Sequence, residues 1–434
     1  MMQRWTKRLT ILLFVVAIFG SSLLGASVQV QAAEVQANLG LAVKSAILIE
    51  ASTGKILYSS NPDLPLPPAS MTKMMTEYLV LEAIKQGKIK WDEKVPVSDY
   101  AFFIAKMGDS SGVYLNKGES FSVQELYKAM AIASANDATA LLAEKVGGSE
   151  ANFVQMMNDK AKQLGMKNSY FVTCTGLPAN ELGPYSPQTE NKDNLMTARD
   201  SAILARSLIR DFPEALEYSK IPRFVFRQGQ PGEQKKANYN WMLPGLNNEY
   251  PGVDGLKTGH TDQAGYCFTG TAMRDGMRLI SVVMGSDSET KRFGETKKLF
   301  DYGFSTYKLT KKAPQGSPVK GYETAPVKKG VELTVPVELG SDAMLLSKVG
   351  EENKLKPTVV LNDLTAPIKK GQVVGKLIYK ADGATENDYL QPDDLQKGGI
   401  DLVASQDVEE GSWIRLFFRS IIQFFSNIFK GVVG

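Results

Sequence analysis

The sequence is poor in two residue types that carry much enzyme chemistry: it has one histidine and two cysteines among 434 residues. Zinc hydrolase sites use several His, Cys or carboxylate ligands at recognisable spacings, and none of those spacings occurs in the sequence. A Ser-His-Asp triad would have to use His260. We therefore expect no metal and no cofactor, and a hydrolase would use a base other than histidine. Cys174 and Cys267 are too few for a disulfide framework, so we interpret them as core residues.

An excess of either charge is also missing. The 50 Lys and Arg residues nearly balance the 47 Asp and Glu residues, for a net charge of +3 at pH 7. The basic residues are interleaved with acidic ones, so we expect no nucleic-acid partner. Hydrophobic residues make up 43% of the chain, which allows a sizeable core, and the length favours more than one domain.

The N-terminus carries the pattern of a targeting segment. Three basic residues, Arg4, Lys7 and Arg8, precede an apolar run over residues 9–19, and small residues follow. This pattern is typical of a secretory signal peptide, here residues 1–32, and predicts an exported protein. An uncleaved membrane anchor is the alternative, but the apolar run is short for a spanning helix.

Strand and helix patterns alternate after this segment. Residues 44–63 predict a strand hairpin, and the Asp-Gly turn at 275–276 marks a second one. Helical spacing of apolar residues occurs over 71–86, 123–133, 138–146, 150–164 and 197–209, and again over 295–304. Strands at both ends with helices between them imply one mixed α/β (α+β) domain, residues 33–309, whose sheet joins distant parts of the chain.

The composition changes near Thr310. Short runs rich in Val, Leu and Thr, separated by Gly, Pro and Asp, predict a small all-β domain over residues 310–405. The last segment, residues 406–434, combines a wide aromatic face with a thin basic stripe that includes Arg415 and Arg419. Such an amphipathic helix is expected to lie in a membrane interface rather than span it, and the alternative is a helix packed on the β domain.

Ser70 and Lys73 are the first candidates for chemistry. A proline-rich approach ends at Ser70, and the helical pattern that follows carries Lys73 on the same face. Serine is a favoured helix N-cap. A serine hydroxyl is also a nucleophile when a base takes its proton, and a lysine of lowered pKa can be that base. The spacing alone does not decide, because Ser-x-x-Lys also begins at Ser52, Ser288, Ser305 and Ser317.

Two further motifs follow in order along the chain. Ser134-Ala-Asn136 lies on a connection between helical patterns, where it can present a hydroxyl and an amide to one cleft. The alternative is that Ser134 or Asn136 caps the next helix. Lys257-Thr-Gly259 begins a strand, where a cation and a hydroxyl can bind a carboxylate and the glycine lets a substrate backbone approach closely.

The three motifs, Ser70-Met-Thr-Lys73, Ser134-Ala-Asn136 and Lys257-Thr-Gly259, closely resemble those of the penicillin-recognising serine enzymes. Within that superfamily the chain resembles a low-molecular-mass penicillin-binding protein of the D-alanyl-D-alanine carboxypeptidase type. The resemblance implies a transpeptidase/β-lactamase-like domain with a mixed sheet and a helical cluster, followed by the small all-β domain and the C-terminal amphipathic helix. It also implies a location on the outer face of the cytoplasmic membrane, with peripheral attachment through that helix.

The resemblance also implies roles for the motif residues. Ser70 would attack the carbonyl between two D-alanines, Lys73 would be its base, and Ser134 would relay a proton to the leaving amine. The expected substrates are peptidoglycan stem peptides that end in D-Ala-D-Ala, and β-lactam antibiotics would acylate the same serine. The positions that bind the substrate would be Asn136, Lys257, Thr258, Gly259, the backbone of His260, which forms the oxyanion hole with that of Ser70, and Arg292 near the substrate carboxylate.

Three alternatives to a D,D-carboxypeptidase share parts of this pattern. A D,D-endopeptidase uses the same chemistry in a cleft of different shape. A class A β-lactamase would need a carboxylate that positions water, usually within Glu-x-x-Leu-Asn, and no such sequence lies between Asn136 and Lys257. A non-catalytic peptidoglycan-binding protein would not need the complete motifs. The segment "YSPQTENKDNLMTARD" does not indicate which residue would promote deacylation.

Overall fold

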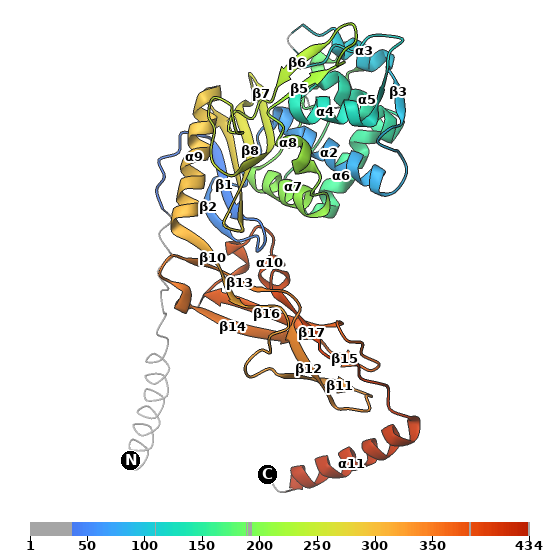
Figure 1. Ribbon diagram of the computed structural model, residues 1–434, viewed down its shortest axis with the longest axis vertical. Helices are drawn as coiled ribbons and strands as arrows, with labels where there is room; N and C mark the ends of the chain where they lie inside the picture. The colour runs from blue at the N-terminus through green and yellow to red at the C-terminus, as the bar shows by residue number, and fades with distance from the viewer. Residues whose placement is uncertain (1–36, 109, 188, 190–192, 382, 433–434) are drawn as a thin grey trace, which may run out of the picture. The chain divides into compact units, whose positions relative to one another are not determined.

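The computed structural model describes residues 37–432, apart from residues 109, 188, 190–192 and 382 (Figure 1). The signal peptide expected over residues 1–32 lies outside the described residues. The chain divides into two units, Met1–Asn38 and Leu39–Gly434, and all elements below belong to the second.

A five-stranded antiparallel sheet with the order β2-β1-β9-β8-β7 supports the motif residues. Its strands are β1 (Ser45–Glu50), β2 (Ile56–Ser60), β7 (Val253–Thr261), β8 (Gly265–Arg274) and β9 (Met277–Ser286). Asp275 and Gly276 turn β8 into β9 with φ values of 48° and 79°, which suits an Asp-Gly hairpin turn. Ala46 of β1 lies opposite Val283 of β9. The sheet therefore joins distant parts of the chain, as predicted.

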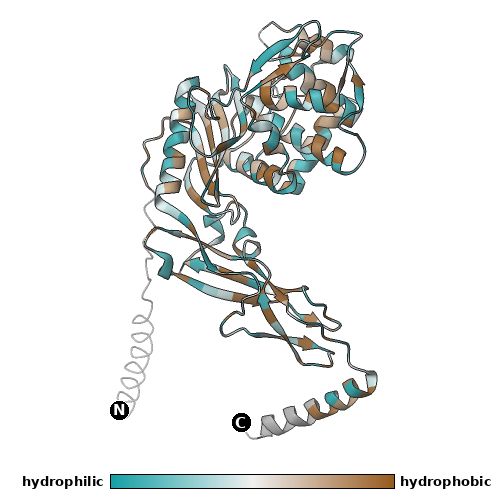
Figure 2. Cartoon of the chain, in the orientation of Figure 1, coloured by the Kyte–Doolittle hydropathy of each residue, from teal (hydrophilic) through white to brown (hydrophobic). Residues whose placement is uncertain are grey.

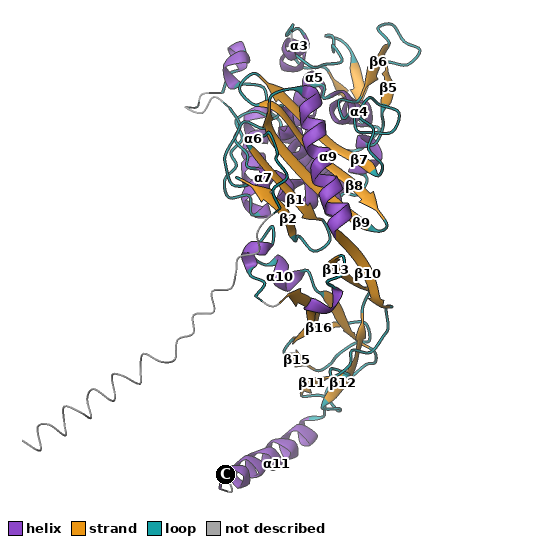
Figure 3. Cartoon of the chain, turned by 90° about the vertical axis from the view of Figure 1, so that its left-hand side faces the viewer, coloured by secondary structure: helices purple, strands orange, loops and turns teal. Residues whose placement is uncertain are grey.

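Helices cover both faces of this sheet (Figure 3). Ile47 and Ile49 of β1 pack into one core with a helical cluster. Ala46 and Leu48, which point the other way, pack into a second core with α9 (Glu289–Thr306). The cluster contains the helices α2 (Lys73–Lys85), α3 (Asp99–Ala105), α4 (Val123–Ala133), α5 (Asn136–Gly147), α6 (Glu150–Leu164), α7 (Ala198–Asp211) and α8 (Ala215–Ser219). It also contains two pairs of short antiparallel strands. In the first, β3 (Lys94–Pro96) pairs with β4 (Ser120–Ser122), and in the second, β5 (Arg223–Phe226) pairs with β6 (Gln234–Ala237).

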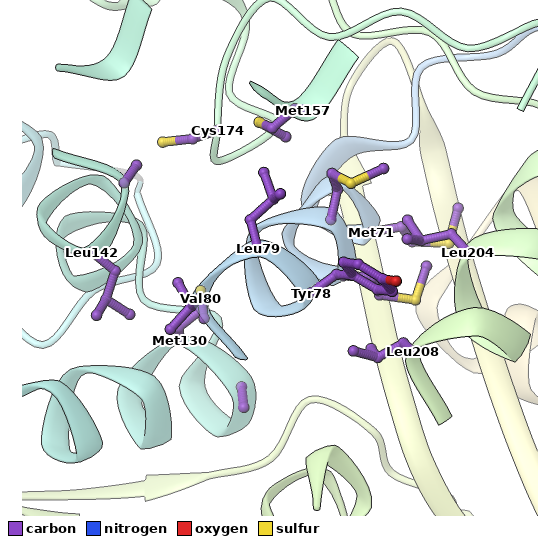
Figure 4. Packing of buried hydrophobic residues seen from close by; sticks show 14 of the residues in the cluster. Met71, Tyr78, Leu79, Val80, Met130, Leu142, Met157, Cys174, Leu204 and Leu208 are labelled. Atoms are coloured by element: carbon purple, nitrogen blue, oxygen red, sulfur yellow. The ribbon is translucent and has the colours of Figure 1, made fainter. Parts of the chain in front are cut away.

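Helix α2 runs through the middle of the cluster. Figure 4 shows its residues Tyr78 and Leu79 among Met130, Leu142 and Leu204 of the neighbouring helices α4, α5 and α7. Nearly every side of α2 is buried, including polar positions in its first two turns. A surface helix would expose these polar groups to water, whereas α2 brings them into the interior.

The residues after α9 form a mainly β region with its own core. β10 (Tyr307–Ala313) continues from α9 and pairs with β13 (Ala343–Lys348). A six-stranded sheet of order β14-β16-β17-β12-β11-β15 contains β11 (Thr324–Lys328), β12 (Thr334–Leu339), β14 (Leu355–Leu361), β15 (Leu364–Thr365), β16 (Val373–Ala381) and β17 (Ile400–Ala404), with the short helix α10 (Asp394–Lys397) before β17. Val335, Val337 and Leu339 of β12 alternate into the core, as strand periodicity requires.

The last described element is the helix α11 (Trp413–Val432). Hydrophobic and hydrophilic residues are interspersed on its coloured part, which begins at Trp413 (Figure 2). Trp413, Phe418 and Ile422 are 76%, 60% and 68% exposed. Arg419 donates to the carbonyl oxygens of Gly330 at 2.8 Å and Val331 at 3.2 Å, in the connection between β11 and β12. Among the helices described, none combines the length and apolar character needed to cross a membrane.

Candidate active site

Ser70 lies in a short 3₁₀ helix, η1 (Ala69–Thr72), which leads directly into α2. The alternative that Ser70 caps a helix is wrong: the N-cap residues of η1 and α2 are Pro68 and Thr72, and no side-chain cap bond occurs at either described helix start. In a 3₁₀ turn, side chains three residues apart nearly eclipse one another. Lys73 Nζ accordingly lies 2.8 Å from Ser70 Oγ.

Lys73 is fully buried, and its amine also donates to the carbonyl oxygen of Thr175 at 2.7 Å. The backbone beyond Thr175 approaches η1 very closely, because a Cβ on Gly176 would lie 2.0 Å from the carbonyl oxygen of Ala69. Burial, and then the positive charge of Lys257, hold the pKa of Lys73 well below its usual value. This environment favours the neutral amine that a base requires.

Ser134 ends α4 in the left-handed conformation, with φ 53° and ψ 28°, and Ala135 is the N-cap of α5. The alternative that Ser134 or Asn136 caps this helix is wrong, since α5 has no side-chain cap bond in the described structure. Lys257 Nζ instead donates to Ser134 Oγ at 2.9 Å. Asn136 Nδ2 donates to Ser110 Oγ at 2.7 Å, and Asn136 Oδ1 is buried without a partner among the described residues.

Lys257, Thr258 and Gly259 lie in β7, at the edge of the five-stranded sheet, and the side chains of Lys257 and Thr258 are buried. Burial lowers the pKa of Lys257 to about 8, and the Glu77 carboxylate opposes this decrease. A glycine is required at position 259 for a structural reason in addition to the predicted approach of a substrate backbone. A Cβ there would lie 2.3 Å from the carbonyl oxygen of Pro68, so the glycine allows β7 to pack directly against the segment that holds Ser70.

His260 belongs to the same strand, whereas Arg292 approaches it from α9. The His260 ring is exposed and stacks on Tyr266, with ring centroids 4.1 Å apart. Arg292, in the first turn of α9, is 2% exposed. Its guanidinium donates to Glu289 at 2.8 Å and lies 3.4 Å from the carbonyl oxygen of Gly259, and its Nε has no partner among the described residues. The buried positive charge of Arg292 therefore lies next to the backbone of the Lys-Thr-Gly strand.

Two buried residues near these groups were not identified from the sequence. Asn194 Oδ1 accepts from the backbone N–H groups of Val172 and Thr173, and Asn194 Nδ2 donates to Thr72 Oγ1 and to the Thr173 carbonyl. Asn194 therefore links η1 to the segment that contains Thr175, whose carbonyl oxygen accepts from Lys73. Glu77 lies one helical turn beyond Lys73 in α2. Its four-residue spacing from Lys73 is a signal that could have identified Glu77 from the sequence.

Two family models match the chain. The model described as D-alanyl-D-alanine carboxypeptidase matches residues 29–288, and the model described as penicillin-binding protein 5, C-terminal domain, matches residues 304–410. The first match begins before the described residues and covers all three motifs.

Curated relatives and solved structures give the same assignment. D-alanyl-D-alanine carboxypeptidase DacF of Bacillus subtilis is 39% identical over 82% of this chain and 87% of its own length, and DacA of Escherichia coli is 34% identical over 90% and 89%. The structure of a peptidoglycan synthesis regulatory factor (PBP3) from Streptococcus pneumoniae has a TM-score of 0.76 at 36% identity, covering 85% of this chain and 100% of that one. The chain therefore belongs to the D-alanyl-D-alanine carboxypeptidase family, and it is a serine-type D-Ala-D-Ala carboxypeptidase.

Proposed function

We propose that the chain removes the terminal D-alanine from peptidoglycan pentapeptide stems through an acyl-enzyme on Ser70. The contact of 2.8 Å between Lys73 Nζ and Ser70 Oγ carries this proposal, because the lysine is buried in surroundings that favour its neutral form. Ser70 Oγ bonds to the carbonyl carbon of the penultimate D-alanine, its proton passes to Lys73, and the bond from that carbon to the terminal nitrogen breaks. Water then hydrolyses the ester, returns a proton to Ser70 Oγ and releases the shortened stem.

Ser134 relays the proton from Lys73 to the leaving nitrogen. The leaving amine needs this proton as its bond to carbon breaks. Ser134 Oγ accepts from Lys257 Nζ at 2.9 Å, which orients the hydroxyl so that its own O–H can donate elsewhere. A protonated Lys257 beside it also makes the Ser134 hydroxyl a better proton donor.

The remaining motif residues bind the substrate. Lys257, Thr258 and Arg292 hold the terminal carboxylate, and Asn136 orients the substrate amide. The buried Asn136 Oδ1 and Arg292 Nε support these roles, because neither has a partner among the described residues and buried polar atoms are normally hydrogen-bonded. A bound substrate would supply the missing partners.

The oxyanion that develops in the transition state would be bound by backbone N–H groups. We assign this role to the N–H groups of Ser70 and His260. The assignment uses the backbone of His260 and not its ring, which is exposed and stacked on Tyr266. Gly259 lies between Thr258 and His260 and keeps this strand close to η1.

We also expect β-lactams to acylate Ser70 and inhibit the enzyme. Penicillin-binding protein D2 from Listeria monocytogenes, solved in ampicillin-bound and cefotaxime-bound forms, is 36% identical over 62% of this chain with a TM-score of 0.53. A β-lactam carbonyl would be attacked as the carbonyl between the two D-alanines is, and the resulting ester would occupy the same serine.

The test is release of D-alanine from a diacyl-Lys-D-Ala-D-Ala peptide, together with mass-spectrometric mapping of a penicillin adduct. The wild-type chain should release D-alanine and carry the adduct on Ser70, and Ser70→Ala should do neither. Ser305→Ala is the matched control, because Ser305 also begins a Ser-x-x-Lys tetrapeptide but its hydroxyl contacts only the Tyr302 carbonyl at 3.3 Å in the described structure. Undiminished release by Ser70→Ala would remove the proposal.

A D,D-endopeptidase activity is the second candidate. A D-alanyl-D-alanine endopeptidase of Pseudomonas aeruginosa is 31% identical over 60% of this chain and 76% of its own length. The two activities are separated by incubating the enzyme with a cross-linked dimeric stem peptide beside the linear pentapeptide. Conversion of the dimer to monomers at a rate comparable with D-alanine release would establish the second activity.

We propose that the protein is exported by its signal peptide, residues 1–32, and attached to the outer face of the cytoplasmic membrane by α11. The exposure of Trp413, Phe418 and Ile422 supports attachment, because an interfacial helix presents aromatic and aliphatic side chains to lipid. The protein lacking the signal should float with phospholipid vesicles, and the same protein ended at residue 412 should not. Equal flotation of the two forms would contradict the role of α11.

A further inference from the structure

A carboxylate that the proposed mechanism does not use lies beneath the active site. Glu77 follows Lys73 by four residues in α2, so the two side chains share one face of the helix. Glu77 is 2% exposed, and the hydroxyl of Tyr127 from α4 donates to Glu77 Oε2 at 3.2 Å. A buried ionised carboxylate is costly unless positive charge lies nearby. The charges that surround Glu77 therefore decide its state.

Both active-site lysines act on Glu77, Lys73 from its own helix and Lys257 from β7, which packs against α2. Burial raises the pKa of Glu77 to about 7, and the positive charge of Lys257 opposes this increase more strongly than that of Lys73 does. In return, the Glu77 carboxylate opposes the effect of burial on the pKa of Lys257. Lys257 Nζ donates to Ser134 Oγ at 2.9 Å and to the Thr258 carbonyl oxygen at 3.2 Å, so no carboxylate of the described residues bonds to it directly. Glu77 is the buried carboxylate on the helix against which β7 packs, and this position makes it the counter-charge for Lys257.

Other titratable groups surround these partners and act on Glu77 through them. Asp137 of α5 and the thiol of Cys174 act on Lys73, Arg292 of α9 acts on Lys257, and Tyr218 of α8 and Glu214 act on Tyr127. Arg292 disfavours the charged form of Lys257, which makes a compensating negative charge more important there.

We propose that Glu77 is a positioning residue that supplies the counter-charge for Lys257, so that the buried site keeps Lys257 as an ammonium while Lys73 remains a free amine. One carboxylate can compensate one ammonium, and a second buried ammonium at Lys73 would be left uncompensated. Lys73 has the Thr175 carbonyl and the Ser70 hydroxyl as partners, which a neutral amine also satisfies. The inference rests on the roles proposed above for Lys73 and Lys257.

The proposal predicts how Glu77→Gln changes the pH dependence of catalysis. The glutamine keeps an oxygen that can accept from Tyr127 but removes the negative charge, which lowers the pKa of both lysines. Lys257 then loses its proton at lower pH, and Lys73 becomes neutral at lower pH. Both limbs of the profile of kcat/KM against pH should move in the acid direction, whereas a merely structural role would lower the profile without moving it.

The experiment measures kcat/KM for D-alanine release against pH with the full chain without its signal. Glu77→Gln should move the alkaline limb down by about one pH unit, the lower end of the effect of a nearby opposite charge. Glu77→Asp, which keeps the charge, should leave both limbs close to those of the wild type. The matched control is Glu82→Gln on the same helix, where the carboxylate pairs with Lys160 at 2.7 Å, and its limbs should not move.

Tyr127→Phe decides the question if Glu77→Gln does not fold. The Tyr127 hydroxyl stabilises the Glu77 anion, so its removal should shift both limbs in the same direction by a smaller amount. Limbs that stay at their wild-type positions in a folded variant would overturn the role of Glu77. A wild-type chain that neither releases D-alanine nor binds penicillin covalently would instead overturn the proposed function, so the two failures are distinguishable.

Discussion

Lys257 Nζ donates to Ser134 Oγ at 2.9 Å, and this bond joins the edge strand β7 to the turn between α4 and α5. Both side chains are 3% exposed. The residue proposed to bind the substrate carboxylate is thus in direct contact with the residue proposed to relay the proton. In the proposed mechanism, binding of the terminal carboxylate and departure of the terminal amine would therefore depend on one hydrogen-bonded pair.

Ser134→Ala is expected to lower kcat/KM for D-alanine release by about 10²–10⁴-fold, the usual contribution of a positioned proton donor. The substitution also removes the acceptor for Lys257 Nζ. Steady-state kinetics with the diacyl-Lys-D-Ala-D-Ala peptide checks this. Ser281→Ala is the matched control, because Ser281 is equally buried but its hydroxyl has no partner among the described residues. Loss of activity in both variants would point to a general effect of removing a buried serine.

The pH profile of kcat/KM for the wild type is expected to be bell-shaped. Lys73 must be neutral to act as base, so activity rises with pH through its depressed pKa. Lys257 must be charged to bind the carboxylate, so activity falls as pH rises through about 8. Activity that continues to rise toward the ordinary lysine pKa of about 10.4 would contradict this assignment of the two lysines.

The motif residues could be named from the sequence, whereas the contacts that organise them could not. Ser70, Ser134 and Lys257 were identifiable because the three motifs occur together in order. The contact of Lys257 with Ser134 and the packing of β7 against η1 join distant parts of the chain, and the hydrophobic pattern does not encode them. Asn194 lies in a segment without periodicity, and its partners are backbone groups that every residue carries.

The sequence also did not allow us to predict which charged residues are buried. Arg292 has the helical spacing and charged neighbours of a surface residue, yet its guanidinium is buried against the rings of Tyr266 and Phe293. Long-range packing of α9 on β8 decides this burial. The longer helices of the cluster, α2, α4, α5, α6 and α7, were predictable in contrast, because apolar spacing and glycine stops such as Gly87 and Gly165 are local signals. The short helices α3 and α8 were not predicted.

Gly259→Ala is expected to disturb Ser70 although it removes no functional group. The new Cβ would lie 2.3 Å from the Pro68 carbonyl oxygen and 3.2 Å from the Met71 nitrogen, so η1 would have to move. Overpacking of this kind costs about 1–3 kcal/mol, and we expect penicillin acylation to slow by about tenfold or more. The matched control is Gly294→Ala in α9, where a Cβ meets no atom within 4 Å. Acylation of Gly259→Ala at the wild-type rate would show that η1 tolerates displacement.

Asn194→Ala is expected to reduce both stability and acylation, because Asn194 fastens Thr72 to the backbone of Thr173, two residues before the Thr175 carbonyl that holds Lys73. Each buried group left unsatisfied costs about 1–3 kcal/mol of unfolding free energy. Asn158→Ala is the matched control, since Asn158 bonds the N–H and carbonyl of Phe171 in the same segment but farther from Lys73. Denaturant unfolding should show both variants destabilised, whereas stopped-flow acylation by a penicillin should be slowed in Asn194→Ala alone. Equal acylation by the two variants would mean that Asn194 contributes only to stability, and Lys73 would then be positioned by burial and not by the segment that Asn194 fastens.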